Sequence, residues 1–373
     1  MIYIAKSYDI SVQRKNSMKE PDMIVECFSK KDLSFLLKGF TVSQLFYNFL
    51  IDMVDELKID KEKLEKKTKF PVVKITDKER LPLLKAFRLW RAIESTTKRS
   101  DIGLIIADYF TINKAGIIGD LFLNTPNLKE SVEIMKRFIS IIMDNISLSY
   151  EENDHYFIFY FDIVPRFLIP MSVTECYIKI CYNWVKEYTQ KEQLDVEEIN
   201  FYGHIPPHLK YYHQILPNTK IYFNHTKNYV ILDKKMFYKK NSRKTTNSCP
   251  VLIKHAKKII NSIAKSKTFT QKVLNQIIIT MPDQKNNEDE ISKKLKMSKS
   301  TLKRRLKEEN ENFKNLTENL RKMLSTSLLK DDLSFEEIAY LLGYSEYSPF
   351  FRAFKKWYNI SPSDYRKQFV NYC

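Results

Sequence analysis

The chain has 373 residues, 43% of them hydrophobic, and a formal net charge of +17. This length predicts two or three domains, and five cysteines without a Cys-x-x-Cys pair exclude a disulfide framework. The longest apolar stretch, residues 156–173, is interrupted by charged residues and prolines, which excludes a membrane span, and the first ten residues lack the pattern of a signal peptide. We therefore expect a soluble cytoplasmic protein that contacts no membrane.

The positive charge is concentrated in one part of the chain. Residues 234–281 hold 12 lysines and arginines and no acidic residue, whereas residues 1–233 hold 32 against 31. Such a block favours a polyanionic partner and adds salt-dependent affinity without sequence preference. A solvated linker in a lysine-rich protein explains the block equally well.

Residues 1–38 form an N-terminal extension in which residues 3–12 and 23–28 have the pattern of short strands. From residue 41 onward the apolar residues recur with helical spacing. This spacing predicts helices over residues 42–53, 58–67, 77–98, 101–110 and 127–145.

At residue 147 the periodicity changes. Residues 147–163 predict a β-hairpin with aromatic-rich strands and a polar turn at residues 151–154. A helix over residues 173–187 follows, and then short strands over residues 197–202, 220–224 and 229–232. Helices first and a small sheet later predict an α+β domain, to which we assign residues 39–240.

A basic linker over residues 241–266 follows this domain. Residues 251–266 predict a helix with four isoleucines on one face, Ile253, Ile259, Ile260 and Ile263. Its place between two domains makes it a candidate relay of a conformational state, and a passive spacer is the alternative.

The last hundred residues contain two copies of a helix-turn-helix pattern. In the second copy, about residues 334–358, Ile338, Leu341 and Leu342 form an apolar helical face and Gly343 ends the helix. A second helix follows, for which Ser345 or Ser348 is the expected N-cap and Pro349 suits the first turn. Its aromatic residues are expected to face inward (Phe350, Phe351, Phe354) and its cations to project elsewhere (Arg352, Lys355, Lys356).

The first copy, about residues 288–308, aligns with the second at an offset of 47 residues before the turn and 48 after it. Ile291, Leu295 and Met297 lie 47 positions before the corresponding residues of the second copy. Leu302 and Arg304 lie 48 before theirs, so the second turn contains one extra residue. Small residues also match, with Ser292 opposite Ala339 where two helices cross. A repeat of apolar, small and basic positions indicates an internal duplication.

A helix over about residues 315–330 connects the copies. It carries one stripe of leucines, Leu316, Leu320, Leu324 and Leu328. We expect this helix to hold the two motifs rigidly apart.

These residues resemble the DNA-binding domain of AraC/XylS transcription regulators, which has two such motifs bridged by a long helix. The chain also has the family's closing Ser-Pro-x-x-Tyr-Arg run, from Ser361 to Arg366. It departs from the family where glycine is usual, at Lys296, Asn310 and Asn359. Asparagine tolerates the left-handed conformation, whereas Lys296 in the first turn is expected to cost about 1 kcal/mol.

The N-terminal half resembles the effector domain of the AraC/XylS subgroup that includes ornithine-utilisation and virulence regulators. Residues 116–138 and 199–237 carry this resemblance. Such domains are described as arabinose-binding-like, but nothing in these residues indicates a sugar site.

The resemblance implies an all-α DNA-binding domain over residues 267–373 that reads two successive major grooves. Base contacts are expected from Ser300, Thr301 and Arg304 in the first reading helix and from Tyr347, Ser348 and Arg352 in the second. Phosphate contacts are expected from Lys303, Lys355 and Lys356, and Lys307 lies beside them. A charged helix face is usually only solvated surface, but two matched copies favour the interface.

The expected function is that of a transcription regulator, an activator by resemblance to the family, that binds double-stranded DNA. The expected further partners are RNA polymerase, a small-molecule effector of unknown identity and a second copy of the chain, bound through the N-terminal domain. Two alternatives stay open: control by protein contact without a small ligand, and non-specific architectural binding to DNA.

No catalytic residue, cofactor or metal is predicted. His204, His208 and His213 are close in sequence, but Pro206 and Pro207 break the helix that would align them. Cys176 and Cys181 have a helical spacing that is poor for a shared ligand. With no nucleophile elbow, phosphate loop or nucleotide fingerprint, catalysis has no support.

Overall fold

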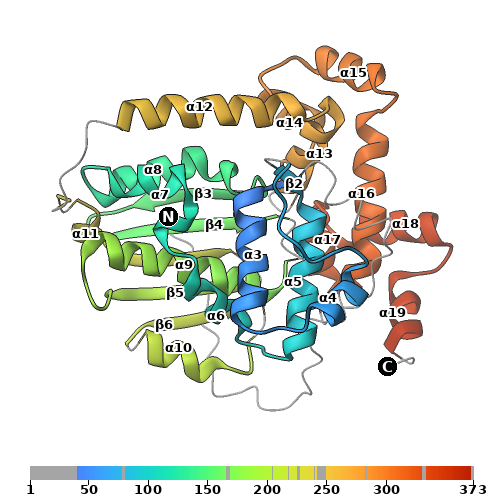
Figure 1. Ribbon diagram of the computed structural model, residues 1–373. Helices are drawn as coiled ribbons and strands as arrows, with labels where there is room; N and C mark the ends of the chain where they lie inside the picture. Colours follow the sequence, from blue (N-terminus) through green and yellow to red (C-terminus); the bar gives the residue numbers. More distant parts are fainter. Residues whose placement is uncertain are drawn as a thin grey trace.

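The computed structural model describes residues 40–77, 80–164, 169–203, 205–216, 218–224, 227–238, 240–241, 249–281, 284–329 and 333–370. The strands expected within residues 1–38 lie outside these residues. The described chain forms an N-terminal α+β region followed by an all-helical part, as predicted (Figure 1).

The N-terminal region opens with a small two-stranded antiparallel sheet and helices. The elements are β1 (Thr41–Ser43), α3 (Gln44–Glu56), α4 (Lys61–Thr68), β2 (Arg80–Pro82), α5 (Leu83–Thr97), α6 (Ile102–Tyr109), η1 (Ile112–Ala115), α7 (Ile117–Leu123), α8 (Leu128–Phe138) and η2 (Ile139–Ile141).

Two of the predicted helices are wrong at one end. The helix expected from residue 77 begins at Leu83, because the residues before it pair as β2 with β1. The helix expected to reach residue 145 ends at Phe138. Beyond it the backbone bonds to β1, with the Ser43 amide donating to the Ile142 carbonyl at 2.7 Å and the Asp144 amide to the Thr41 carbonyl at 3.1 Å. Long-range pairing overrides the local helical pattern at both places.

A five-stranded sheet follows, in the order β3-β4-β7-β5-β6. Its strands are β3 (Ile146–Glu152), β4 (Tyr156–Ile163), β5 (Val196–Tyr202), β6 (Lys220–Asn224) and β7 (Asn228–Asp233), with α9 (Met171–Thr189), α10 (Leu209–Ile215) and α11 (Lys234–Tyr238) between or after them. All neighbouring strands pair antiparallel, except β5 and β6, which are parallel to each other. The predicted hairpin is confirmed, but its ladder extends to Glu152 and Phe157, so the turn begins two residues later than expected.

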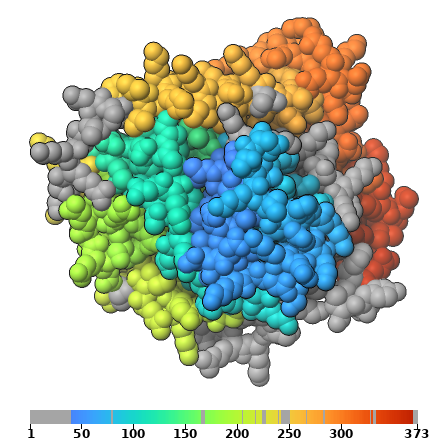
Figure 2. Space-filling view, viewed as in Figure 1, coloured from blue at the N-terminus to red at the C-terminus, as the bar shows by residue number. Residues whose placement is uncertain are grey.

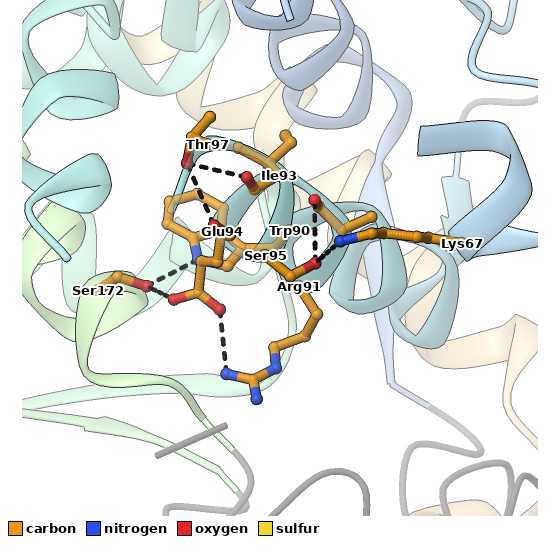
Figure 3. Close-up of polar contacts among 9 residues, drawn as sticks. Lys67, Trp90, Arg91, Ile93, Glu94, Ser95, Thr97 and Ser172 are labelled. Atoms are coloured by element: carbon orange, nitrogen blue, oxygen red, sulfur yellow. Dashed lines mark hydrogen bonds and ion pairs between the residues drawn. The ribbon is translucent and has the colours of Figure 1, made fainter. Parts of the chain in front are cut away.

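Helix α9 is fixed at its first turn by α5 and α6. The Trp90 indole donates to the Ser172 hydroxyl at 2.9 Å, and that hydroxyl contacts the Glu94 carboxylate (Figure 3). A Cβ on Gly103 of α6 would lie 1.9 Å from the Ser172 carbonyl oxygen. Only glycine permits this close approach of α6 to α9.

Helix α12 (Cys249–Ser266) lies across the N-terminal region, in contact with α7, α8 and η2 (Figures 1 and 2). Ala256 and Ile263 are buried, while Ile253, Ile259 and Ile260 are half-buried. The expected apolar face therefore packs on the N-terminal region.

The C-terminal part contains only helices among its described residues. They are α13 (Phe269–Thr280), α14 (Glu288–Lys294), α15 (Lys299–Glu308), α16 (Phe313–Leu328), α17 (Phe335–Leu341), α18 (Tyr347–Tyr358) and α19 (Pro362–Val370). The leucine stripe of α16 is buried, with Leu316, Leu320, Leu324 and Leu328 at most 2% exposed. No helix in the described part of the chain is long and apolar enough to cross a membrane.

Candidate nucleic-acid interface

The turns of the two helix-turn-helix motifs have the same backbone structure. In the first, the Lys296 amide donates to the Lys293 carbonyl at 2.9 Å and the Met297 amide to the Ser292 carbonyl at 3.0 Å. The same two bonds recur 47 residues later, from Gly343 to Tyr340 and from Tyr344 to Ala339, both at 2.9 Å. This bonding ends a helix with one left-handed residue. The internal duplication is therefore present in the conformation as well as in the sequence.

The three positions at which the resemblance led us to expect glycine all have positive φ. The angles are 55° at Lys296, 57° at Asn310 and 60° at Asn359. The residue of the second turn that matches Lys296 is Gly343, with φ of 71°. A Cβ on Gly343 would lie 2.9 Å from the side-chain amide nitrogen of Asn286. The two turns thus share one backbone conformation although one carries a lysine and the other a glycine.

The first reading helix, α15, presents its cations to solvent. Ser298 caps it, its hydroxyl accepting from the Thr301 amide at 3.2 Å, and Leu302 and Leu306 are buried beneath. Ser300, Lys303, Arg304 and Lys307 are exposed, and Thr301 is half-buried. Three cations of α15 pair with carboxylates of the same motif: Lys299 with Asp289 at 2.6 Å, Arg304 with Glu308 at 2.6 Å and Lys303 with Glu288 at 3.1 Å.

The second reading helix, α18, begins differently from the prediction. Its N-cap is Glu346, which makes no side-chain cap bond, so neither Ser345 nor Ser348 has that role. The extra residue in the turn moves Ser345 outside the cap and leaves Ser348 inside the first turn, where the backbone is already helical. Pro349 lies in the first turn as expected.

The side chains of α18 divide into a buried and an exposed face. Phe350 and Phe354 are fully buried, whereas Phe351 is only half-buried. Tyr347 is half-buried, its ring 5.7 Å from that of Phe335 in α17. The remaining predicted contact residues are exposed: Ser348, Arg352, Lys355 and Lys356.

Helix α16 holds the second motif through contacts that the sequence analysis missed. Arg321 donates to the carbonyls of Leu342 and Gly343, each at 2.9 Å, and so fixes the turn before α18. The Trp357 indole donates to Glu318 at 2.9 Å. With 16 residues, α16 is about 24 Å long. Figure 1 shows α15 above its upper end and α18 beside its lower half.

Two family models match the chain. A helix-turn-helix domain matches residues 291–368, and the arabinose-binding domain of AraC transcription regulators, an N-terminal domain, matches residues 59–239. The chain belongs to the AraC/XylS family. The N-terminal match includes residues 116–138 and 199–237, which carried the resemblance, and the C-terminal match lies within the expected DNA-binding domain, residues 267–373.

Several transcription regulators are similar to this chain over part of their length. An uncharacterised HTH-type transcriptional regulator of Mycobacterium tuberculosis is 36% identical over 80 residues, which is 21% of this chain and 23% of the relative. The transcriptional activator PerA of Escherichia coli is 32% identical over 111 residues, 29% of this chain and 40% of PerA. The match thus spans about a quarter to two-fifths of these relatives. Among solved structures, the transcriptional regulator CdpR of Pseudomonas aeruginosa aligns with 87% of this chain and 98% of its own, at 16% identity and a TM-score of 0.43.

Of the histidines and cysteines considered for metal binding, those that the structure describes belong to no group of three or more possible metal ligands. His208 pairs with Glu175 at 2.8 Å, and His204 lies outside the described residues. Burial raises the pKa of the Cys181 thiol to about 12 and that of Cys176 further, which disfavours the thiolate that binds metals. Among the described residues, no three His, Cys, Asp or Glu side chains form a group that could hold a metal ion.

Proposed function

We propose that this chain is a sequence-specific DNA-binding transcription regulator that presents α15 and α18 to successive major grooves of one duplex. The observation that carries this proposal is the repetition of one turn geometry before two reading helices with exposed cations, at two places along α16. Helix-turn-helix proteins place the second helix of each motif in the major groove, and successive grooves are about 34 Å apart.

The exposed residues of each reading helix supply the proposed contacts. Base edges are read by Ser300, Thr301 and Arg304 of α15 and by Tyr347, Ser348 and Arg352 of α18. Phosphates are bound by Lys303, Lys307, Lys355 and Lys356. Arginine can bond two acceptors of guanine at once, whereas lysine acts on phosphate as a point charge.

The basic block extends the interface as a source of affinity without sequence preference. Four of its lysines are exposed on α12: Lys254, Lys257, Lys258 and Lys265. Each lysine that neutralises a phosphate releases counterions, so its contribution falls with salt.

An effector acting through the N-terminal region is proposed to control this activity, with α12 as the relay. The contacts of α12 with α7, α8 and η2 support a relay over a passive spacer, because a change in those elements alters the surface on which α12 rests. An effector shifts the equilibrium only by binding one conformation more tightly than the other.

The proposal includes activation through RNA polymerase, a homodimer formed by the N-terminal region, and action on chromosomal DNA in the cytoplasm. Sedimentation equilibrium of the full chain measures the oligomeric state. Control by protein contact alone becomes the better account if no small molecule raises the melting temperature of the protein.

Footprinting of genomic fragments with the purified full chain tests the function. We expect protection of a discrete asymmetric site made of two short boxes about one helical turn apart. Uniform protection without a preferred sequence would identify an architectural DNA-binding protein instead.

A further inference from the structure

The N-terminal region contains a cavity of about 100 Å³ between α9 and the sheet. Its wall is almost entirely apolar and includes Phe161 from β4, Trp184 from α9, Phe201 from β5 and Leu232 from β7. An apolar cavity of roughly 150 Å³ in another protein stays dry and accommodates benzene, so this one has room for about four to six non-hydrogen atoms.

Two charged side chains of α9 line the otherwise apolar cavity, Glu175 and Lys179. Glu175 of α9 lines the cavity, and its side chain is 0% exposed. Its Oε1 accepts from the Tyr212 hydroxyl and lies 2.8 Å from Nε2 of His208. Burial and the neighbouring carboxylate raise the pKa of Tyr212 well above its ordinary value, so this phenol stays protonated and donates.

The second oxygen of the same carboxylate is unsatisfied. Oε2 of Glu175 is buried and has no hydrogen-bond partner among the described residues. Lys179, one helical turn further along α9, is engaged elsewhere, since its Nζ donates to Asp108 at 2.7 Å and to the Leu104 carbonyl at 3.0 Å. Buried acceptors are nearly always hydrogen-bonded, because burying an unpaired one costs free energy. A ligand that donates to Oε2 would offset this cost.

We propose that this cavity binds a small molecule with an apolar body and one ammonium group, which donates to Oε2 of Glu175. The apolar wall selects the body, and the buried carboxylate selects a cationic donor over a neutral alcohol or an acid. The cavity determines the class of ligand, and the role of this ligand as the effector rests on the proposed function.

The walls of this cavity connect it to two further features. A second cavity of about 70 Å³ shares Met135, Cys181 and Trp184 with the first, so movement of these side chains lengthens the space for the ligand body. Val132 and Met135 belong to α8, which also supports α12. A ligand in the cavity therefore touches the helix on which the relay rests.

The test is a thermal-shift and calorimetric comparison of n-butylamine, butan-1-ol and butyrate with the full chain, without DNA and at one ionic strength. We expect only the amine to raise the melting temperature, by mass action. Glu175→Gln keeps the shape and the Oε1 acceptor but replaces Oε2 with an NH₂ group, and we expect it to weaken amine binding at least tenfold. Glu197→Gln, which changes an exposed side chain of β5, is the matched control and leaves binding unchanged.

Val185→Phe, which places a ring in the cavity wall, is expected to abolish the shift while Glu175 is intact. Equal binding of alcohol and amine, or equal amine binding by wild type and Glu175→Gln, overturns the proposal. If Glu175→Gln does not fold, the three-ligand comparison on the wild type decides alone. A chain that binds DNA but no amine contradicts this inference only, and one that binds the amine but no DNA contradicts only the proposed function.

Discussion

Arg304 and Arg352 occupy matching positions of the two reading helices but have different neighbours. Arg304 is paired with Glu308 one turn further along α15. The position one turn beyond Arg352 is Lys356, and no ion pair of Arg352 is found among the described residues. Arg304 must release a carboxylate before it can contact a base, whereas Arg352 need not. We therefore expect the second motif to contribute more to specificity.

Substitution of the α18 cations tests the proposed division between base reading and phosphate binding. We expect Arg352→Ala to lose about 1–3 kcal/mol of discrimination at one base pair of the site. Lys356→Ala should weaken binding to specific and random DNA alike. It should also reduce the slope of log affinity against log salt concentration by about 0.9. Competition binding with single-base variants of the site and with random DNA measures both effects. Equal losses on specific and random DNA for both variants would show that Arg352 does not read a base.

The left-handed lysine of the first turn is a site of local strain. Lys296→Gly removes the clash of Cβ with the backbone at φ of 55°, and we expect the free energy of unfolding to rise by about 0.5–1 kcal/mol. Asn310→Gly is the control, since asparagine tolerates its φ of 57° and the change should be near zero. Urea unfolding of the full chain measures the difference. Destabilisation by Lys296→Gly would mean that the lysine side chain makes a contact worth more than the strain.

At the scale of elements, the packing of α13 onto α15 depends on a cap supplied from a distant residue. The carboxylate of Glu309 accepts from the amides of Phe269 and Thr270, both at 2.8 Å, at the first turn of α13. Arg305 lies over the Phe269 ring at 4.3 Å. The N-terminus of a helix has unpaired amides and a partial positive charge, so a carboxylate there is favourable.

We expect Glu309→Gln to lower the free energy of unfolding by about 1 kcal/mol at neutral pH, as loss of a helix cap does. Glu308→Gln, which breaks only the exposed pair with Arg304, should have a much smaller effect. Thermal unfolding of the two variants beside the wild type measures the difference. Equal destabilisation by both variants would show that Glu309 does not cap α13.

The same contact predicts a dependence on pH. Burial would raise the pKa of Glu309, but the Thr270 and Phe269 amides outweigh it and lower the pKa below its ordinary value of 4.5. A carboxyl group whose pKa is lower in the folded protein stabilises the fold at pH values above its ordinary pKa. This stabilisation is lost as the pH falls through the pKa of the folded state. The difference between wild type and Glu309→Gln should therefore shrink below about pH 4.5, which unfolding curves from pH 7 to pH 3 measure.

At the scale of the whole molecule, one lysine joins the two parts of the chain. Lys267, between α12 and α13, pairs with Asp144 of the N-terminal region at 2.9 Å, and the two side chains are 14% and 4% exposed. Asp144 also accepts from the amide of Thr41 at 2.6 Å and lies 3.8 Å from Arg80. The junction between the N-terminal region and α13, through which the proposed relay would act, is thus held by a buried ionic network.

We expect Lys267→Ala to lower the free energy of unfolding by roughly 1.5–3 kcal/mol, the range for a hydrogen bond to a charged group. Amide exchange should increase at the end of α12 and the start of α13, because that junction loses its fixed contact. Lys265→Ala, which changes an exposed lysine near the end of α12, is the control. Hydrogen exchange with mass spectrometry measures both variants. Unchanged exchange in Lys267→Ala would show that the pair with Asp144 does not hold the junction.

Local sequence patterns were enough to predict most of the helices and strands. Helix spacing, turn residues and the 47-residue offset predicted both motifs and α16, because each depends on neighbours within a few positions. The ends of α5 and α8 and the cap of α18 were mispredicted, because pairing with β1 and one inserted turn residue decided them.

The sequence by itself determined the fold class, the duplicated motif and the cations that α15 and α18 expose, since periodicity and composition express which faces are buried. Only the tertiary structure decided that Arg321 holds the second turn, that Lys267 meets Asp144 and that Glu175 lines an apolar cavity. These contacts join residues far apart in the chain, and their energies depend on burial and distance, which no local pattern encodes.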